Sequence, residues 1–179
     1  TAAFGRSQLA RLDENLAVAR DHAKVFYEAL KGIKGLILPT EPEGHQHNWY
    51  NFITRVDMDA IGWTGSPAAM RTAILQAIWS EGVPVSQWQK FILPAMTVFQ
   101  AKNAYGHGCP WSCQYAMDVT YDPADYPVAQ RHCDTHMSLI GPLRAPNYDT
   151  DLVLKSAEAF HKVFAQLDRV PVEEAKVGV

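Results

Sequence analysis

"HNWYNFITRVD", residues 47–57, contains the strand on which our fold prediction rests. Residues 48–56 are rich in β-branched and aromatic side chains, a composition typical of strands. A second run of this kind, "LILP" at 36–39, precedes them across a loop that contains proline and glycine. Both runs are therefore predicted to be strands.

Helix-forming patterns lie on both sides of these runs. Apolar residues recur every three or four positions between Leu9 and Leu30, which is typical of an amphipathic helix, and Gly32 follows where helices often end. We expect the helix from about Gln8 to Leu30 to pack its apolar stripe against residues 48–56.

A second helix is predicted to begin at Ser66, whose hydroxyl can cap it, with Pro67 in the first turn and Gly82 at its end. The other expected elements are a strand at 83–87, a long irregular stretch at 90–126, a short helix from Pro127 to about His132, a strand at 137–143, and a last helix that starts at Asp149 or Thr150. Few, short strands interspersed with helices favour an α+β fold, with a small, mostly antiparallel sheet and helices packed on one face.

Composition narrows the classes of partner. The chain has 179 residues, a net charge of -3 and a pI near 6.1, so it has no basic stripe for a nucleic acid. No apolar run reaches the roughly 18 residues that span a bilayer, so no membrane partner is expected. Three cysteines, an odd number, argue against a disulfide framework and favour a cytoplasmic location.

Two short segments have the spacing of a zinc site. "YGHGCPWSC" (105–113) carries Cys109 and Cys113, and "RHCDTH" (131–136) carries His132 and His136. Neither pair is flanked by a second turn signal, and proline and tryptophan stiffen the first pair. We predict that Cys109, Cys113 and Cys133 stay reduced and bind no metal, with a Cys/His zinc site as the alternative.

Several segments, in order, resemble one family. Residues 47–57 look like a small-domain strand of the DegT/DnrJ/EryC1/StrS sugar aminotransferases, with His47, Arg55 and Asp57 at matching positions. Met96 and Gln130 depart from the family pattern, which more often has His and Glu there. The other matching segments are "AAFGRSQLARLDE" (2–14), "LQAIWSEGVPVSQW" (75–88), "ILPAMTVFQ" (92–100) and "YPVAQRHCDTHMSLIGPLRAP" (126–146).

The resemblance implies a small domain like that of fold-type I pyridoxal-phosphate enzymes. Residues 1–32 would link two domains, 33–170 would form the small C-terminal domain, and 171–179 would be a tail. The chain opens with Thr1 and helix-compatible residues, so we expect a piece of a longer protein; a removed initiator Met or tag is the alternative.

The family's chemistry uses pyridoxal phosphate, held by a lysine of the large domain. None of the eight lysines here lies in a matching motif, so we expect neither catalytic residues nor bound cofactor in this chain. The implied parent enzyme is a homodimer that transfers an amino group from a donor to a keto-sugar or cyclitol. A binding or sensing module without catalysis is the alternative function.

Four residues are predicted to contact substrate: Trp88, Gln89, Met96 and His47. In the family the segment after the strand at 83–87 faces the active-site mouth, where an aromatic ring can stack on a sugar. Core packing is the alternative for Trp88 and Met96, and a structural role is the alternative for His47.

Two further features carry expectations about contacts. Arg55 and Arg144 are candidates for binding a carboxylate or phosphate, with a simple ion pair as the alternative. The loop at 102–125 is rich in glycine, proline and aromatic residues, so we expect it to pack on a second copy or on the large domain.

Overall fold

The computed structural model describes residues 2–139 and 149–173, and an antiparallel sheet of four strands organises this part of the chain. The fold is α+β, as predicted. Within these ranges no helix combines the length and the apolarity needed to cross a bilayer. The strands lie in the order β1-β2-β4-β3, and their bounds are Leu36–Ile37 for β1, Phe52–Val56 for β2, Val85–Ser86 for β3 and His136–Leu139 for β4.

Strand β2 is shorter than predicted because side chains capture the backbone just before it. The N–H of Trp49 donates to Nδ1 of His47 at 2.7 Å, and the N–H of Tyr50 donates to Oδ1 of Asn48 at 3.0 Å. Trp49 has a φ of 52°, in the left-handed region. These local bonds compete with strand pairing, so regular β structure begins only at Phe52.

The register of the sheet separates an apolar face from a polar one. Phe52 pairs with Leu139 and Thr54 pairs with Met137, so these side chains point to the same face. On the opposite face Arg55 pairs with His136. Three helices cover the apolar face, and they are α2 (Leu12–Leu30), α4 (Pro67–Ser80) and α8 (Thr150–Phe164).

Three phenylalanines join this sheet to two of its helices. Phe26 on α2 makes edge-on contacts with Phe52 on β2 and with Phe160 on α8, with ring centroids 5.1 and 5.6 Å apart. All three rings are fully buried. The expected packing of the long helix against residues 48–56 is therefore confirmed from Phe26 onward.

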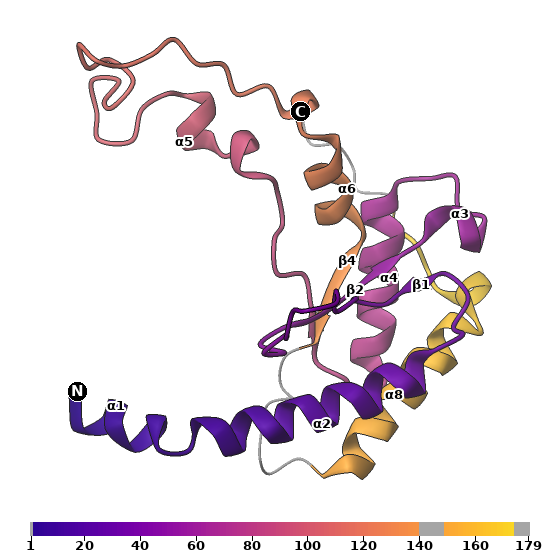
Figure 1. Ribbon diagram of the computed structural model, residues 1–179. Helices are drawn as coiled ribbons and strands as arrows, with labels where there is room; N and C mark the ends of the chain where they lie inside the picture. Colours follow the sequence, from indigo (N-terminus) through magenta and orange to yellow (C-terminus); the bar gives the residue numbers. More distant parts are fainter. Residues whose placement is uncertain (1, 140–148, 174–179) are drawn as a thin grey trace.

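The N-terminal part of that helix differs from the prediction. The helix breaks after α1 (Ala2–Leu9), and α1 and the first turns of α2 extend away from the sheet (Figure 1). Leu9 and Leu12, expected in the buried stripe, are 68% and 44% exposed because no described element covers them. The stripe becomes buried only from Ala19.

Helix ends follow the predicted capping chemistry. The Ser66 hydroxyl accepts from the N–H of Ala69, and the Asp149 carboxylate accepts from the N–H of Leu152. Gly32 and Gly82 follow α2 and α4 with φ values of 83° and 88°, which glycine adopts without strain.

Other boundaries shift by a few residues. The strand expected at 83–87 is limited to β3, and only the first part of the strand expected at 137–143 lies in the described residues. Helix α6 (Pro127–Thr135) is one turn longer than predicted. Elements not predicted are α3 (Met58–Ile61) and a 3₁₀ turn, η3 (Leu167–Arg169).

A long excursion, here called the arm, joins β3 to α6 and comprises residues 87–126. It extends away from the sheet and returns beside α6 (Figure 1). Its only regular structure is short: η1 (Leu93–Ala95), α5 (Thr97–Gln100) and η2 (Pro123–Asp125). The irregular stretch predicted at 90–126 is thus observed, and together with α6 it lines a groove.

Candidate functional site

A buried histidine fixes the point where the arm leaves the sheet. His136 is fully buried, and its Nε2 accepts from the backbone N–H groups of Trp88 and Gln89 at 3.1 and 3.2 Å. Its Nδ1 lies 2.8 Å from the carbonyl oxygen of His132, so Nδ1 carries the proton and donates. Burial lowers the pKa of His136 below its usual value, in keeping with a neutral ring.

A second imidazole lies parallel to the first. The rings of His132 and His136 are 4.6 Å apart with an angle of 2° between their planes. The pKa of His132 is also lowered, mainly by burial and then by the positive charge of Arg55. Two neutral rings can stack in this way, whereas two cations would repel each other.

The two candidate zinc pairs do not come together. In the described part of the chain, no group of three or more His, Cys, Asp or Glu side chains is placed to hold a metal. Both ring nitrogens of His136 already have hydrogen-bond partners. The sulfur atoms of Cys109 and Cys113 lie 3.6 Å apart within the arm.

Two of the four predicted substrate contacts lie at this junction. Trp88 is 55% exposed, with the edge of one ring against Tyr50 at a centroid distance of 6.3 Å. The neighbouring Gln89 lines the groove, and its side-chain amide donates to the carbonyl of Phe91 at 2.8 Å. An exposed indole beside a groove-lining amide can offer both a stacking surface and polar contacts.

The other two predicted contacts lie elsewhere. Met96 is half-buried between η1 and α5 and does not line the groove. His47 is on an exposed loop, where its ring contacts Trp49 at 4.5 Å and accepts that residue's N–H. The structure therefore gives His47 a local turn-stabilising role. Arg144 lies outside the described residues.

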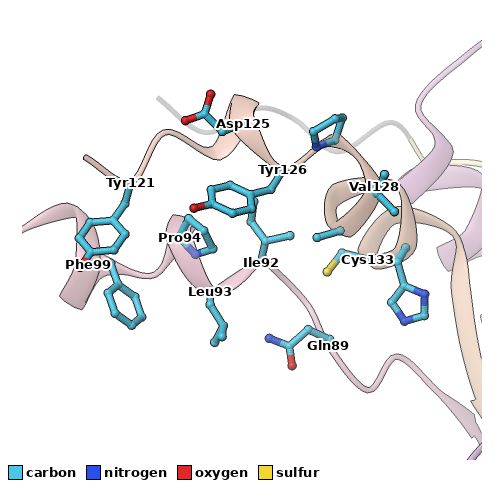
Figure 2. Close-up of a pocket in the computed structure, with 13 residues that line it drawn as sticks. Gln89, Ile92, Leu93, Pro94, Phe99, Tyr121, Asp125, Tyr126, Val128 and Cys133 are labelled. Atoms are coloured by element: carbon cyan, nitrogen blue, oxygen red, sulfur yellow. The ribbon is translucent and has the colours of Figure 1, made fainter. Parts of the chain in front are cut away.

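The groove between the arm and α6 has a volume of about 1070 Å³. Residues 89–99 run along one wall, and residues 121–133 form the other, with Tyr126 between Tyr121 and Val128 (Figure 2). Aliphatic and aromatic side chains make up most of the lining, among them Ile92, Leu93, Pro94, Phe99, Tyr121, Tyr126 and Val128.

Few charges reach this groove. Its lining contains the carboxyl group of Asp125 and the imidazole of His132, but no lysine or arginine. A phosphate group normally needs cationic side chains or several free N–H groups to compensate its charge. The groove is therefore suited to an apolar or aromatic surface and not to a phosphate.

An aromatic cluster stiffens the outer part of the arm. The indole N–H of Trp111 donates to the hydroxyl of Tyr121 at 2.9 Å, and both rings pack on Phe99. Trp111 and Tyr121 thus pack within the arm, whereas the ring of Tyr115 is 87% exposed.

Sequence reasoning missed the structural use of His132 and His136 and the wall formed by Ile92 and Tyr126. The histidine spacing was interpreted as a possible zinc pattern, and no hydrogen bond between His132 and His136 was predicted. The alternative signal was present: a histidine four residues after another, at the end of a short helix, can bond back to the preceding carbonyl.

Solved structures with a similar fold include aminotransferases and a synthase. Over 89% of this chain, 3-amino-5-hydroxybenzoic acid (AHBA) synthase is 19% identical, with a TM-score of 0.65. The aminotransferase TlmJ from Streptoalloteichus hindustanus is 21% identical over 92% of the chain (TM-score 0.61), and an aminotransferase from Psychrobacter cryohalolentis is 21% identical over 94% (TM-score 0.64). The chain spans only 37%, 36% and 39% of these three chains, respectively. At such identities the likeness shows the fold.

No curated protein sequence matches the chain. A family model does match, and it extends over residues 1–144, which include α1, the sheet, the arm and α6. The match covers most of the chain and agrees with the fold of the similar structures. The chain belongs to the DegT/DnrJ/EryC1/StrS aminotransferase family.

Proposed function

We propose that the chain is the C-terminal small domain of a pyridoxal-phosphate-dependent aminotransferase that acts on a keto-sugar or cyclitol. The observation that carries this proposal is the family match over residues 1–144 in a chain that spans about a third of similar aminotransferases. In this proposal residues 1–32 link the domain to a preceding large domain, 33–170 form the small domain, and 171–179 are a tail.

The lysines in residues 2–139 and 149–173 do not fit the cofactor. A lysine that forms a Schiff base needs a desolvated pocket, which lowers its pKa. Of the lysines that the structure describes, only Lys102 is half-buried, and it pairs with Asp118 at 3.7 Å. The rest are exposed, and none lines the groove between the arm and α6. We therefore assign the cofactor and its lysine to the large domain.

The contribution that we assign to this chain is a substrate wall at the base of the arm, formed by the side chains of Trp88 and Gln89. The exposed indole of Trp88 offers a flat surface for the C–H face of a sugar or cyclitol ring. His136 fixes the backbone of Trp88 and Gln89, so these two side chains project from a rigid backbone. A second copy completes the site in the proposed homodimer.

The first test concerns the cofactor and compares two proteins. The parent enzyme should bind about one pyridoxal phosphate per chain and show its Schiff-base absorbance, whereas the 179-residue chain should show no stoichiometric band. Such a band from the short chain, fixed by borohydride, would contradict the assignment of the lysine to the large domain.

The second test concerns the substrate. The parent enzyme is assayed with an amino-acid donor and two panels of acceptors, keto-sugars and keto-cyclitols. Trp88→Ala in the parent should raise KM for the acceptor by about tenfold, equivalent to about 1.4 kcal/mol, while Trp88→Phe should retain most of the affinity. A parent that binds these compounds but transfers no amino group would support a binding or sensing module instead.

A further inference from the structure

Two thiols face each other near the far end of the arm. The sulfur atoms of Cys109 and Cys113 are 3.6 Å apart, close enough for a thiol hydrogen bond. Cys113 is exposed and Cys109 is half-buried, whereas Cys133 is buried on α6. The arm therefore presents a pair of neighbouring thiols to solvent, and the third thiol lies within the fold.

Backbone hydrogen bonds hold the turn that carries this pair. The carbonyl of Cys109 accepts from the N–H groups of Ala104 and Tyr105 at 2.9 and 3.3 Å. The hydroxyl of Ser112 donates to the carbonyl of His107 at 2.8 Å, and the N–H of Cys113 donates to the carbonyl of Pro110 at 3.3 Å. These hydrogen bonds thus hold the turn in a conformation that places the two sulfur atoms opposite each other.

The same turn is anchored to the rest of the arm by Trp111, one of the three residues between the cysteines. Trp111 packs its ring on Phe99 and donates to Tyr121, which keeps residues 109–113 from swinging freely. Because little chain entropy is left to lose when the sulfur atoms join, bond formation between them is favoured over reaction with a distant thiol.

We propose that Cys109 and Cys113 form a redox pair that converts between a dithiol and an intrachain disulfide, with a small disulfide such as oxidised glutathione as the oxidant. It replaces the expectation that Cys109 and Cys113 stay reduced, because their sulfur atoms lie 3.6 Å apart. The inference concerns the arm alone and does not depend on the proposed aminotransferase activity. An oxidised pair would leave one free cysteine, the buried Cys133.

The order of the steps follows from the two environments. The hydrogen bond with Cys113, followed by burial, raises the pKa of the Cys109 thiol. Cys113 is more exposed, so its thiolate attacks one sulfur of oxidised glutathione and releases a glutathione thiolate, leaving a mixed disulfide. The Cys109 thiol then loses its proton to solvent, and its thiolate attacks the Cys113 sulfur and releases the second glutathione. Two thiols are oxidised, and one glutathione disulfide is reduced to two thiols.

The sequence makes this reaction easy to follow by peptide mapping. No lysine or arginine lies between Lys102 and Arg131, so trypsin releases both cysteines in one peptide, 103–131, and Cys133 in another, 132–144. The chain is equilibrated with oxidised glutathione, and its free thiols are alkylated in denaturant. Trypsin then cleaves the chain, and the masses of the peptides are measured by mass spectrometry.

The expected result is a 103–131 peptide that is lighter than the reduced, unalkylated peptide by two hydrogen atoms, beside an alkylated 132–144 peptide. Thiols that are reactive in the native chain should fall from two to none, and reduced glutathione should restore both. The proposal would be overturned by two stable glutathione adducts or by cross-links between chains. It would also be overturned if Cys109 and Cys113 remained open to alkylation, or if a chelator restored their alkylation.

Single substitutions test the roles of the two sulfur atoms. Cys109→Ser should stop the reaction at a stable mixed disulfide on Cys113. Cys113→Ser should form the corresponding adduct on Cys109 more slowly, because that thiol is less exposed and its pKa is raised. Faster reaction at Cys109 would contradict the assigned order. Circular dichroism of both variants checks that they are folded.

Discussion

The Nε2 atom of His136 lies 3.1 Å from the backbone nitrogen of Trp88, and through this contact a central strand holds the base of the arm. The same atom accepts from Gln89, and the ring has its proton on the other nitrogen. Protonation of Nε2 would replace this acceptor with a donor that faces two N–H groups. The charge state of one buried ring is thereby coupled to the position of the proposed substrate wall.

This coupling predicts how stability depends on pH. Burial lowers the pKa of His136 below 6.5 in the folded chain, so as the pH falls the unfolded chain takes up its proton first. The free energy of unfolding should therefore be constant above about pH 7.5 and should decrease as the pH drops through 6.5 towards the folded pKa. Urea unfolding between about pH 5 and 8 measures this change.

The groups around this ring shape the same curve. His132 stacks on His136, and its pKa is also lowered, while the positive charges of Arg71 and Arg55 act in the same direction. The variant His136→Leu should lose about 2 kcal/mol at pH 8 by leaving two N–H groups without an acceptor, and its pH dependence should be weaker. His45→Gln, on an exposed loop, is the control. A wild-type slope in the leucine variant would contradict the assignment.

The phenylalanine contacts predict where the fold is most sensitive. Phe52→Ala should lower the free energy of unfolding by about 3–5 kcal/mol, because a buried ring that contacts Phe26 is removed. Phe4→Ala is the matched control. Phe4 is 70% exposed on α1, so its loss should change stability by no more than about 0.5 kcal/mol. Denaturant titration compares the two, and equal effects would contradict the described core.

The aromatic cluster predicts the order of the arm. Trp111→Ala removes the hydrogen bond to Tyr121 and the packing on Phe99, so backbone amides in residues 99–121 should exchange hydrogen faster. Amides of the sheet should be unaffected because the cluster lies beyond the junction at His136. Tyr115→Ala, which removes an exposed ring, should leave exchange in the arm unchanged. Equal exchange in both variants would show that the cluster does not order the arm.

Metal analysis examines the alternative that the cysteine and histidine spacing suggested. The prediction is that the purified chain contains much less than one zinc per molecule, and that a chelator leaves its unfolding midpoint unchanged. The reason is that the thiol pair and the histidine pair do not form a common ligand set in the part of the chain that the structure describes. About one zinc per chain, lost in Cys109→Ser, would restore the metal site.

The sequence was most informative where local chemistry acts alone. The cap at Ser66 and the glycine at position 32 are determined by neighbouring residues, and both were predicted. The cap of the last helix is Asp149, one of the two residues predicted for it. Strand ends were less predictable, because Trp49 has a strand-like side chain but is held in a turn by His47. The apolar stripe at Leu9 and Leu12 gave no sign that the helix breaks and leaves the core there.

The candidate site depends on contacts between distant parts of the chain. Trp88 and Gln89 were predicted because they follow a strand that the family resemblance had placed near the active-site mouth. Their contact with His136 spans more than 40 residues, and no local pattern encodes it. The groove is formed by two walls that meet only after the arm returns, so its shape could not be derived from either segment by itself.

The start of the arm is bonded to the helix that follows the arm. The side-chain amide of Gln87 donates to the carbonyl of Cys133, in the last turn of α6, at 3.1 Å. Each doubling of the length of a flexible loop costs only about 0.6 kcal/mol, and residues 90–125 contribute no strand to the sheet. We therefore expect that these residues can be shortened or exchanged while the four-stranded core keeps its register.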